Sequence, residues 1–172
     1  MVRVAVALVV VLSLGIGCAG ARSAPTTPAS APAPPVPLRR SASATPDPRA
    51  CPARLRAAVV ARVNEARLAA ALQPLASDAG LGRAAQSRAR SMAAANRLSH
   101  TGWEAVVRRQ GDAPTIAENV AYDYSSADAV VSAWLRSPGH RANMLGRSFR
   151  RIGVGCVVDA RAHLWWAEDL AD

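Results

Sequence analysis

The side chains best suited to acid–base or metal chemistry in this chain are its three histidines, His100, His140 and His163, together with Glu118. Imidazole nitrogens and a carboxylate oxygen are groups that bind Zn²⁺ and that also transfer protons. His163 is expected near a turn and exposed to solvent. We therefore take His100, Glu118 and His140 as the candidate reactive set.

His140 has a setting that favours a neutral imidazole. In the stretch Ser137-Pro138-Gly139-His140, Ser137 is a predicted N-cap, and proline is typical of the first helical position. His140 is then the third residue of a helix, where the positive end of the helix dipole disfavours a charged ring. A neutral imidazole suits a metal ligand or a general base. The alternative is that His140 only caps and packs its helix.

These residues come from separate segments, so only a folded domain brings them together. Hydrophobic periodicity, such as the stripe of Val59 and Val63, predicts the elements that position them. The predicted helices span residues 52–72, 78–96, 101–110, 126–136 and 138–145, and the predicted strands span residues 115–122, 151–159 and 163–170. Helices that come early, followed by a closing hairpin, predict an α+β domain whose helices cover a small antiparallel sheet.

Several short motifs in this order resemble the bacterial branch of the CAP (SCP/PR-1-like) superfamily. The most specific are Ser137-Pro138-Gly139-His140-Arg141-Ala142-Asn143 and Ala117-Glu118-Asn119-Val120-Ala121. They are accompanied by Asn64-Glu65-Ala66-Arg67, Leu98-Ser99-His100 and Ile152-Gly153-Val154-Gly155, so that the resemblance covers essentially all of residues 51–172. It implies an α-β-α sandwich with a central cavity.

The resemblance also implies which residues line that cavity. In animal and plant members two histidines and two glutamates line it, and His100, Glu118 and His140 match three of the four, with Asn119 beside Glu118. Ser137 stands at the position that matches the second glutamate. Two histidines and one glutamate would still hold Zn²⁺ with an open position. A hydrogen-bonded cluster without metal explains the same residues equally well.

Three functions are compatible with such a cavity. The first is a binding module of the cell envelope that takes a lipid, peptide or glycan. The second is a metal-dependent hydrolase that uses His100, Glu118 and His140, and the third is a structural interaction module without chemistry. We favour the binding module over the other two. The sequence contains neither the G-x-S-x-G nor the H-E-x-x-H signature, so the signatures of known hydrolases are lacking. We expect a monomer.

The first residues predict export. Arg3 precedes the apolar run at residues 4–16, as in a signal segment, which we place at residues 1–17. Gly17-Cys18 resembles the end of a lipoprotein box, which would make Cys18 the site of lipidation and of membrane anchoring. Ordinary cleavage after Ala19-Gly20-Ala21 and retention as an uncleaved anchor helix are the alternatives. All three place the domain outside the cytoplasm.

A Pro- and Ala-rich stretch follows, and most of the prolines of the chain lie between Pro25 and Pro52. Such a composition cannot bury enough apolar surface to offset chain ordering. Residues 18–50 are therefore predicted to form a disordered tether, and residues 51–172 the folded domain.

The chain has three cysteines. Lipidation of Cys18 leaves Cys51 and Cys156 as an even pair in an oxidising compartment, which predicts a disulfide. The alternative is two buried thiols.

The formal net charge is +9, and all of the basic residues are arginines. They are spread along the chain, with no run of basic residues longer than two, which argues against a nucleic-acid-binding stripe. Weak attraction to anionic envelope polymers or lipid headgroups is the generic consequence of such a charge.

Overall fold

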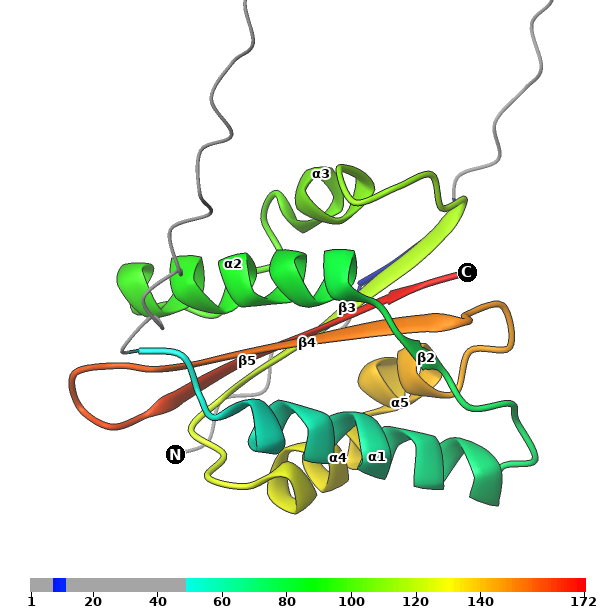
Figure 1. Cartoon of the computed structure of the whole chain (residues 1–172), viewed down its shortest axis with the longest axis horizontal. Helices are drawn as coiled ribbons and strands as arrows, with labels where there is room; N and C mark the ends of the chain where they lie inside the picture. Colours follow the sequence, from blue (N-terminus) through cyan, green and yellow to red (C-terminus); the bar gives the residue numbers. More distant parts are fainter. Residues whose placement is uncertain (1–7, 12–48) are drawn as a thin grey trace, which may run out of the picture.

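The computed structural model describes residues 8–11 and 49–172, and its elements stack in three layers around one sheet (Figure 1). Helices α2 (Ala79–Ala95) and α3 (Trp103–Arg108) cover one face, and α1 (Ala53–Ala69), α4 (Ala127–Arg136) and α5 (Pro138–Met144) cover the other. This is the α-β-α sandwich that the sequence predicts, so the predicted fold class is confirmed.

The sheet has the strand order β1-β3-β5-β4-β2. Its strands are β1 (Leu8–Val11), β2 (Ala76–Ser77), β3 (Thr115–Tyr122), β4 (Arg151–Val158) and β5 (Leu164–Ala171). Neighbouring strands are antiparallel, except that β2 runs parallel to β4. β1 belongs to the predicted signal segment and pairs along the outer edge of β3. The rest of that segment, Cys18 and most of the predicted tether lie outside the described residues.

Two glycines of β4 allow α2 to lie directly against the strand. A Cβ built on Gly153 would come within 2.1 Å of the backbone carbon of Leu81, and one built on Gly155 within 2.2 Å of the backbone of Ala85. Side chains do not tolerate such approaches, so the close packing of α2 on β4 requires glycine at both positions.

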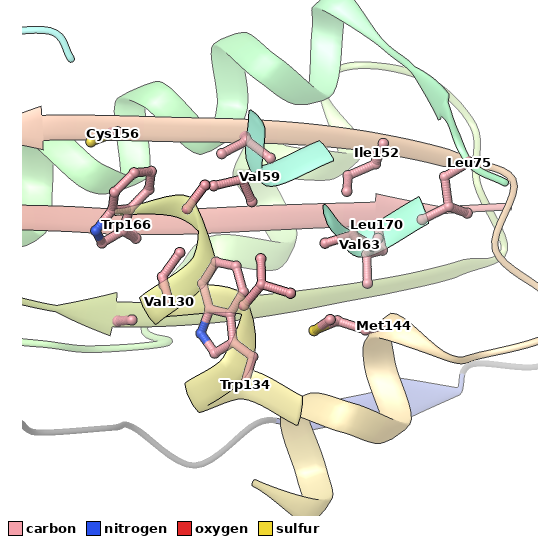
Figure 2. Close-up of a cluster of buried hydrophobic side chains, with 14 of the residues drawn as sticks. Val59, Val63, Leu75, Val130, Trp134, Met144, Ile152, Cys156, Trp166 and Leu170 are labelled. Carbon is pink, nitrogen blue, oxygen red and sulfur yellow. The ribbon is translucent and has the colours of Figure 1, made fainter. Parts of the chain in front are cut away.

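The largest hydrophobic core lies between the sheet and the layer of α1, α4 and α5 (Figure 2). Trp134 of α4 and Trp166 of β5 are its bulkiest side chains, and both are fully buried. Val59 and Val63 of α1 pack in the same cluster, as the predicted stripe requires. In a domain rich in alanine, the two indole rings supply much of the volume that fills this core.

A disulfide between Cys51 and Cys156 joins the start of α1 to β4, with the two Cα atoms 5.3 Å apart. The backbone N–H of Cys51 also donates to the carbonyl of Cys156 at 3.1 Å. The predicted disulfide is therefore confirmed, and it fastens one helical layer to the outer edge of the sheet.

The structure corrects several local predictions. Helix α1 ends at Ala69 rather than at residue 72, because Ala71 adopts a left-handed φ of 56°. Ser137 occupies the predicted N-cap of α5, but its side chain makes no capping hydrogen bond. His163 is half-buried rather than exposed, and its Nδ1 lies 2.7 Å from Asp123 Oδ1.

The two-residue strand β2 was not predicted, since two residues are too few to show any period. In the part of the chain that the structure describes, no helix is both long and apolar enough to cross a bilayer.

Candidate functional site

The pleat of β3 separates Glu118 from Asn119, because neighbouring residues of a strand point to opposite faces of the sheet. Glu118 is opposite Asp169 of β5, and Asn119 is opposite Glu168. Residues directly opposite each other share a face. All four side chains are fully buried. Two polar clusters therefore lie back to back across the sheet, one toward α2 and one toward α5.

The α2-side cluster consists of Arg88, His100, Glu118 and Asp169. Arg88 Nε donates to Glu118 Oε2 at 2.7 Å, and its Nη2 donates to Oε1 at 3.3 Å. His100 Nδ1 lies 2.9 Å from Glu118 Oε1. Because a carboxylate oxygen accepts, Nδ1 carries the hydrogen of this bond. Arg88 also donates to the carbonyls of Ser99 and Thr101, which holds the segment around His100 in place.

Asp169 is a second buried carboxyl in the α2-side cluster. Burial raises its pKa well above the usual range, and repulsion from Glu118 adds to this, while the charge of Arg88 acts in the opposite direction. One guanidinium therefore faces two carboxyl groups. The raised pKa of Asp169 favours its protonated form, so that one guanidinium need not offset two carboxylates.

The α5-side cluster consists of Asn119, Asn143, Glu168 and the backbone of His140. Asn119 Nδ2 donates to Glu168 Oε2 at 2.6 Å and to the His140 carbonyl at 3.2 Å, and Asn143 Nδ2 donates to Asn119 Oδ1 at 2.9 Å. Burial raises the pKa of Glu168 to about 7, against the opposing effects of the Asn119 hydrogen bond and the Arg67 charge. These contacts fasten α5 to the centre of the sheet.

The structure joins two members of the predicted set, His100 and Glu118, by a hydrogen bond. His100 and Glu118 meet in the α2-side cluster, whereas the backbone of His140 is bonded in the α5-side cluster. Asn119, predicted beside Glu118 in one cavity, points to the α5 side.

The predicted residues do not fit a shared zinc ion. Both oxygens of Glu118 already contact Arg88 or His100, and the adjacent guanidinium repels a cation. Among residues 8–11 and 49–172, no group of three or more His, Cys, Asp or Glu side chains is placed to hold a metal ion. The common metal site of His100, Glu118 and His140 is accordingly corrected to two hydrogen-bonded clusters on opposite faces.

A cleft of about 460 Å³ opens beside the α2-side cluster. It is lined by His100, Gly102, Trp103, Glu104, Ala105 and Arg108. His100 Nε2 and Trp103 Nε1 are buried next to this cleft and have no hydrogen-bond partner within the described part of the chain. A buried polar atom left without a partner costs about 1–3 kcal/mol. A bound group that reaches either atom would recover part of that free energy.

Sequence reasoning missed Arg88 and Arg67, which carry much of the buried polar bonding. Arg67 is buried on α1 and donates to the carbonyls of Gln73, Met144 and Gly146 at 2.7–3.0 Å. Each arginine stands at an inward-facing position of its helix, among apolar residues. A charged residue at such a position indicates a buried arginine with hydrogen-bond partners, and this was the signal that the sequence offered.

The comparisons with known proteins agree with this fold. Residues 60–168 match the family described as "CAP: Cysteine-rich secretory protein family". The chain is 31% identical over 105 residues to "Uncharacterized protein YkwD" of Bacillus subtilis, an alignment that covers 58% of this chain and 41% of YkwD. The matched part thus spans about two fifths of that relative's length.

Solved structures share the architecture at low sequence identity. An outer surface protein from Borrelia burgdorferi superposes with a TM-score of 0.67 at 17% identity, over 72% of this chain and 96% of that one. An extracellular protein containing an SCP domain from Bacillus anthracis gives a TM-score of 0.62 at 23% identity, over 69% of this chain and 40% of that one. With the family match covering more than half of its residues, this chain belongs to the cysteine-rich secretory protein (CAP) family.

Proposed function

We propose that this protein is an exported CAP-domain protein that binds an amide-bearing segment of the cell envelope, either a peptide or an N-acetylated glycan. The binding site is the cleft beside His100. The observation that carries the proposal is the pair of buried, unpartnered atoms next to the cleft, His100 Nε2 and Trp103 Nε1.

The chemistry of the two atoms favours an amide. In the neutral imidazole tautomer with its hydrogen on Nδ1, Nε2 is an acceptor, while the indole Nε1 is only a donor. An amide supplies both complements, since its N–H donates and its carbonyl accepts. Glu104 and Arg108 make the lining polar, which favours such a ligand over a lipid chain.

Binding fits this site better than metal-assisted hydrolysis. A hydrolase of the predicted kind requires a metal held by His100, Glu118 and His140, and Glu118 is instead engaged by Arg88 and His100. In the proposed site the ion pair with Arg88 keeps Glu118 in place, and Glu118 keeps the imidazole oriented at the cleft wall.

Titration calorimetry of the full chain with two soluble probes, an N-acetylglucosamine tetramer and an N-acetylated alanine tripeptide, tests the proposal. His100→Gln should weaken binding of the preferred probe about tenfold, as expected for one lost hydrogen bond. His163→Gln, a half-buried histidine outside the cleft, is the matched control and should bind as the wild type does. Equal affinities of His100→Gln and wild type, or no heat from either probe, would overturn the assignment.

We also propose that Cys18 is lipidated and tethers the domain to the membrane. The lipoprotein-like Gly17-Cys18 and the Pro-rich stretch that follows support this. Cys18→Ala should release the protein or block its processing, as seen by fractionation and intact mass. A variant that stays membrane-bound at the wild-type processed mass would contradict lipidation.

A further inference from the structure

A second, larger hollow lies away from the cleft, at the outer edge of β4. It is a groove of about 690 Å³ between the start of α1 and helix α2, and its lining includes Ala50, Arg56, Arg83, Gln86, Arg90 and Val154. It shares no lining residue with the cleft beside His100.

The groove lies along the outer edge of β4. Other parts of the chain form hydrogen bonds to this edge at two places, and the stretch of strand between them forms the groove wall. At one end β2 covers the strand, and the Asp78 N–H donates to the Ile152 carbonyl at 2.9 Å. At the other end the Gln86 side chain bonds the backbone of Cys156 twice, at 3.0 and 3.2 Å. Val154 lies between these two covers and forms part of the groove wall.

The lining of the groove is basic. It contains three arginines, and no Asp or Glu of the described part of the chain is among the residues that form it. Arg83 and Arg90 are seven residues apart on α2, which places them on one face of the helix two turns apart. Arg56 reaches the groove from α1, and its Nη1 donates to the Cys51 carbonyl at 2.5 Å.

The start of α1 adds to this positive potential. Its N-cap is Pro52, which supplies no side-chain acceptor, and no acidic residue lies in its first turn. The partial positive charge of the helix end therefore faces the same space as the arginines.

We propose that this groove binds a phosphodiester, of the kind found in the headgroup of an anionic phospholipid or in a phosphate-linked envelope polymer. Guanidinium groups bind phosphate oxygens in bidentate fashion, and two arginines two turns apart suit an extended anion. The volume accommodates a glycerol–phosphate unit rather than a single small ion. The lining also includes Ala50, next to the first residue of the described range 49–172.

Binding of the full chain to vesicles tests the proposal. The probes are vesicles of phosphatidylcholine alone and vesicles that contain phosphatidylglycerol, and the quantity compared is the additional binding caused by the anionic lipid. The double variant Arg83→Gln with Arg90→Gln should reduce this increment about tenfold or more, at about 1 kcal/mol for each arginine near an anionic surface. Both residues are exposed, so the melting temperature should not change.

The matched control is Arg97→Gln with Arg161→Gln, which removes the same charge from exposed positions outside the groove. It should reduce the increment less than threefold. An equal loss in both double variants would mean that net charge alone attracts the protein, and the groove assignment would be wrong.

A second arm separates the two sources of phosphate. Soluble glycerophosphoglycerol is titrated into the full chain and into Arg83→Gln with Arg90→Gln. Saturable binding to the wild type that is lost in the variant assigns the groove to a free phosphodiester or polymer. Vesicle binding without soluble binding assigns it to a headgroup at the bilayer surface. Absence of both overturns the proposal.

Discussion

At the scale of single residues, the α2-side cluster contains a buried ion pair between Arg88 and Glu118, with Asp169 as a second carboxyl group beside it. Arg88 faces two buried carboxyl groups, Glu118 and Asp169, and it also donates to the carbonyls on either side of His100. Removing one partner of a buried pair is more damaging than replacing both. The position of His100 at the cleft therefore depends on a residue that does not line the cleft.

Arg88→Met should consequently lower the free energy of unfolding by about 3–5 kcal/mol, because Glu118 is left buried without its counter-charge. Urea denaturation at neutral pH measures this. Arg83→Met, an exposed arginine on the same helix, is the control and should change little. A variant at Arg88 that unfolds at the wild-type urea concentration would show that the charge of Arg88 does not stabilise the fold.

Glu168 makes the stability of the domain depend on pH. Its pKa is raised from 4.5 to about 7 in the folded state by burial, so the folded chain binds a proton more tightly than the unfolded chain. The stabilisation from this group is complete below pH 4.5 and is lost as the pH rises through about 7.

Glu168→Gln mimics the protonated form and keeps an acceptor for Asn119. We expect the variant to be more stable than wild type at pH 8, by about 3 kcal/mol at most, and equally stable at pH 4. Thermal unfolding between these pH values is the measurement. Glu65→Gln, at an exposed site on α1, should leave the pH dependence unchanged. The same pH dependence in Glu168→Gln and wild type would rule out Glu168 as its source.

The family resemblance predicted that His100 and Glu118 lie close together. It did not predict that Arg88 and Asp169 lie beside them. Glu168 and Asp169 follow two buried tryptophans in β5. Alternation along the strand places their side chains on opposite faces of the sheet, but it does not say which residues of the neighbouring strand they contact. Which of the two carboxyl groups shares a face with Glu118 depends on the pairing of β5 with β3, about 50 residues apart in the sequence. Chain order carries no information about that register, which is why the two clusters were predicted as one.

At the scale of elements, the contact between α2 and β4 positions the α2-side cluster. It depends on Gly153 and Gly155, which leave no space between helix backbone and strand. Any side chain at either position must push α2 outward, and with it Arg88.

Gly155→Ala should therefore destabilise the domain by about 3 kcal/mol or more, because the clash is with backbone atoms of Ala85 and cannot be relieved by a rotamer change. Gly82→Ala is the matched control on α2, where a Cβ meets nothing within 4 Å. It should stabilise the helix by up to about 1 kcal/mol. Chemical denaturation measures the free energy of unfolding of both variants. Equal values for the two would contradict the role assigned to the close packing of α2 on β4.

The three long strands were predicted although both of their faces are buried. Periodicity predicted every helix in the region from residue 49 onward, because each helix buries one stripe. It failed where no period exists. The end of α1 is set by the left-handed backbone at Ala71, and β2 is defined by its pairing with β4 alone.

At the scale of the whole molecule, the disulfide ties the first helix to the fourth strand across a separation of 105 residues. The chain-entropy account gives roughly 4–5 kcal/mol as an upper value for a loop of this length. The double variant Cys51→Ser with Cys156→Ser should accordingly melt well below the oxidised wild type. Reduction of the wild type should reproduce the shift, and an unchanged melting temperature after complete reduction would contradict it.

The place of β5 in the sheet has a consequence for when the domain is able to fold. β3 and β4 do not pair with each other; both pair with β5, which follows them in the sequence. Until residues 164–171 have been synthesised, the growing chain lacks the strand that pairs with both β3 and β4, and with it Glu168 and Asp169. The native sheet therefore cannot be completed before β5 has been synthesised, because β5 alone joins β3 to β4.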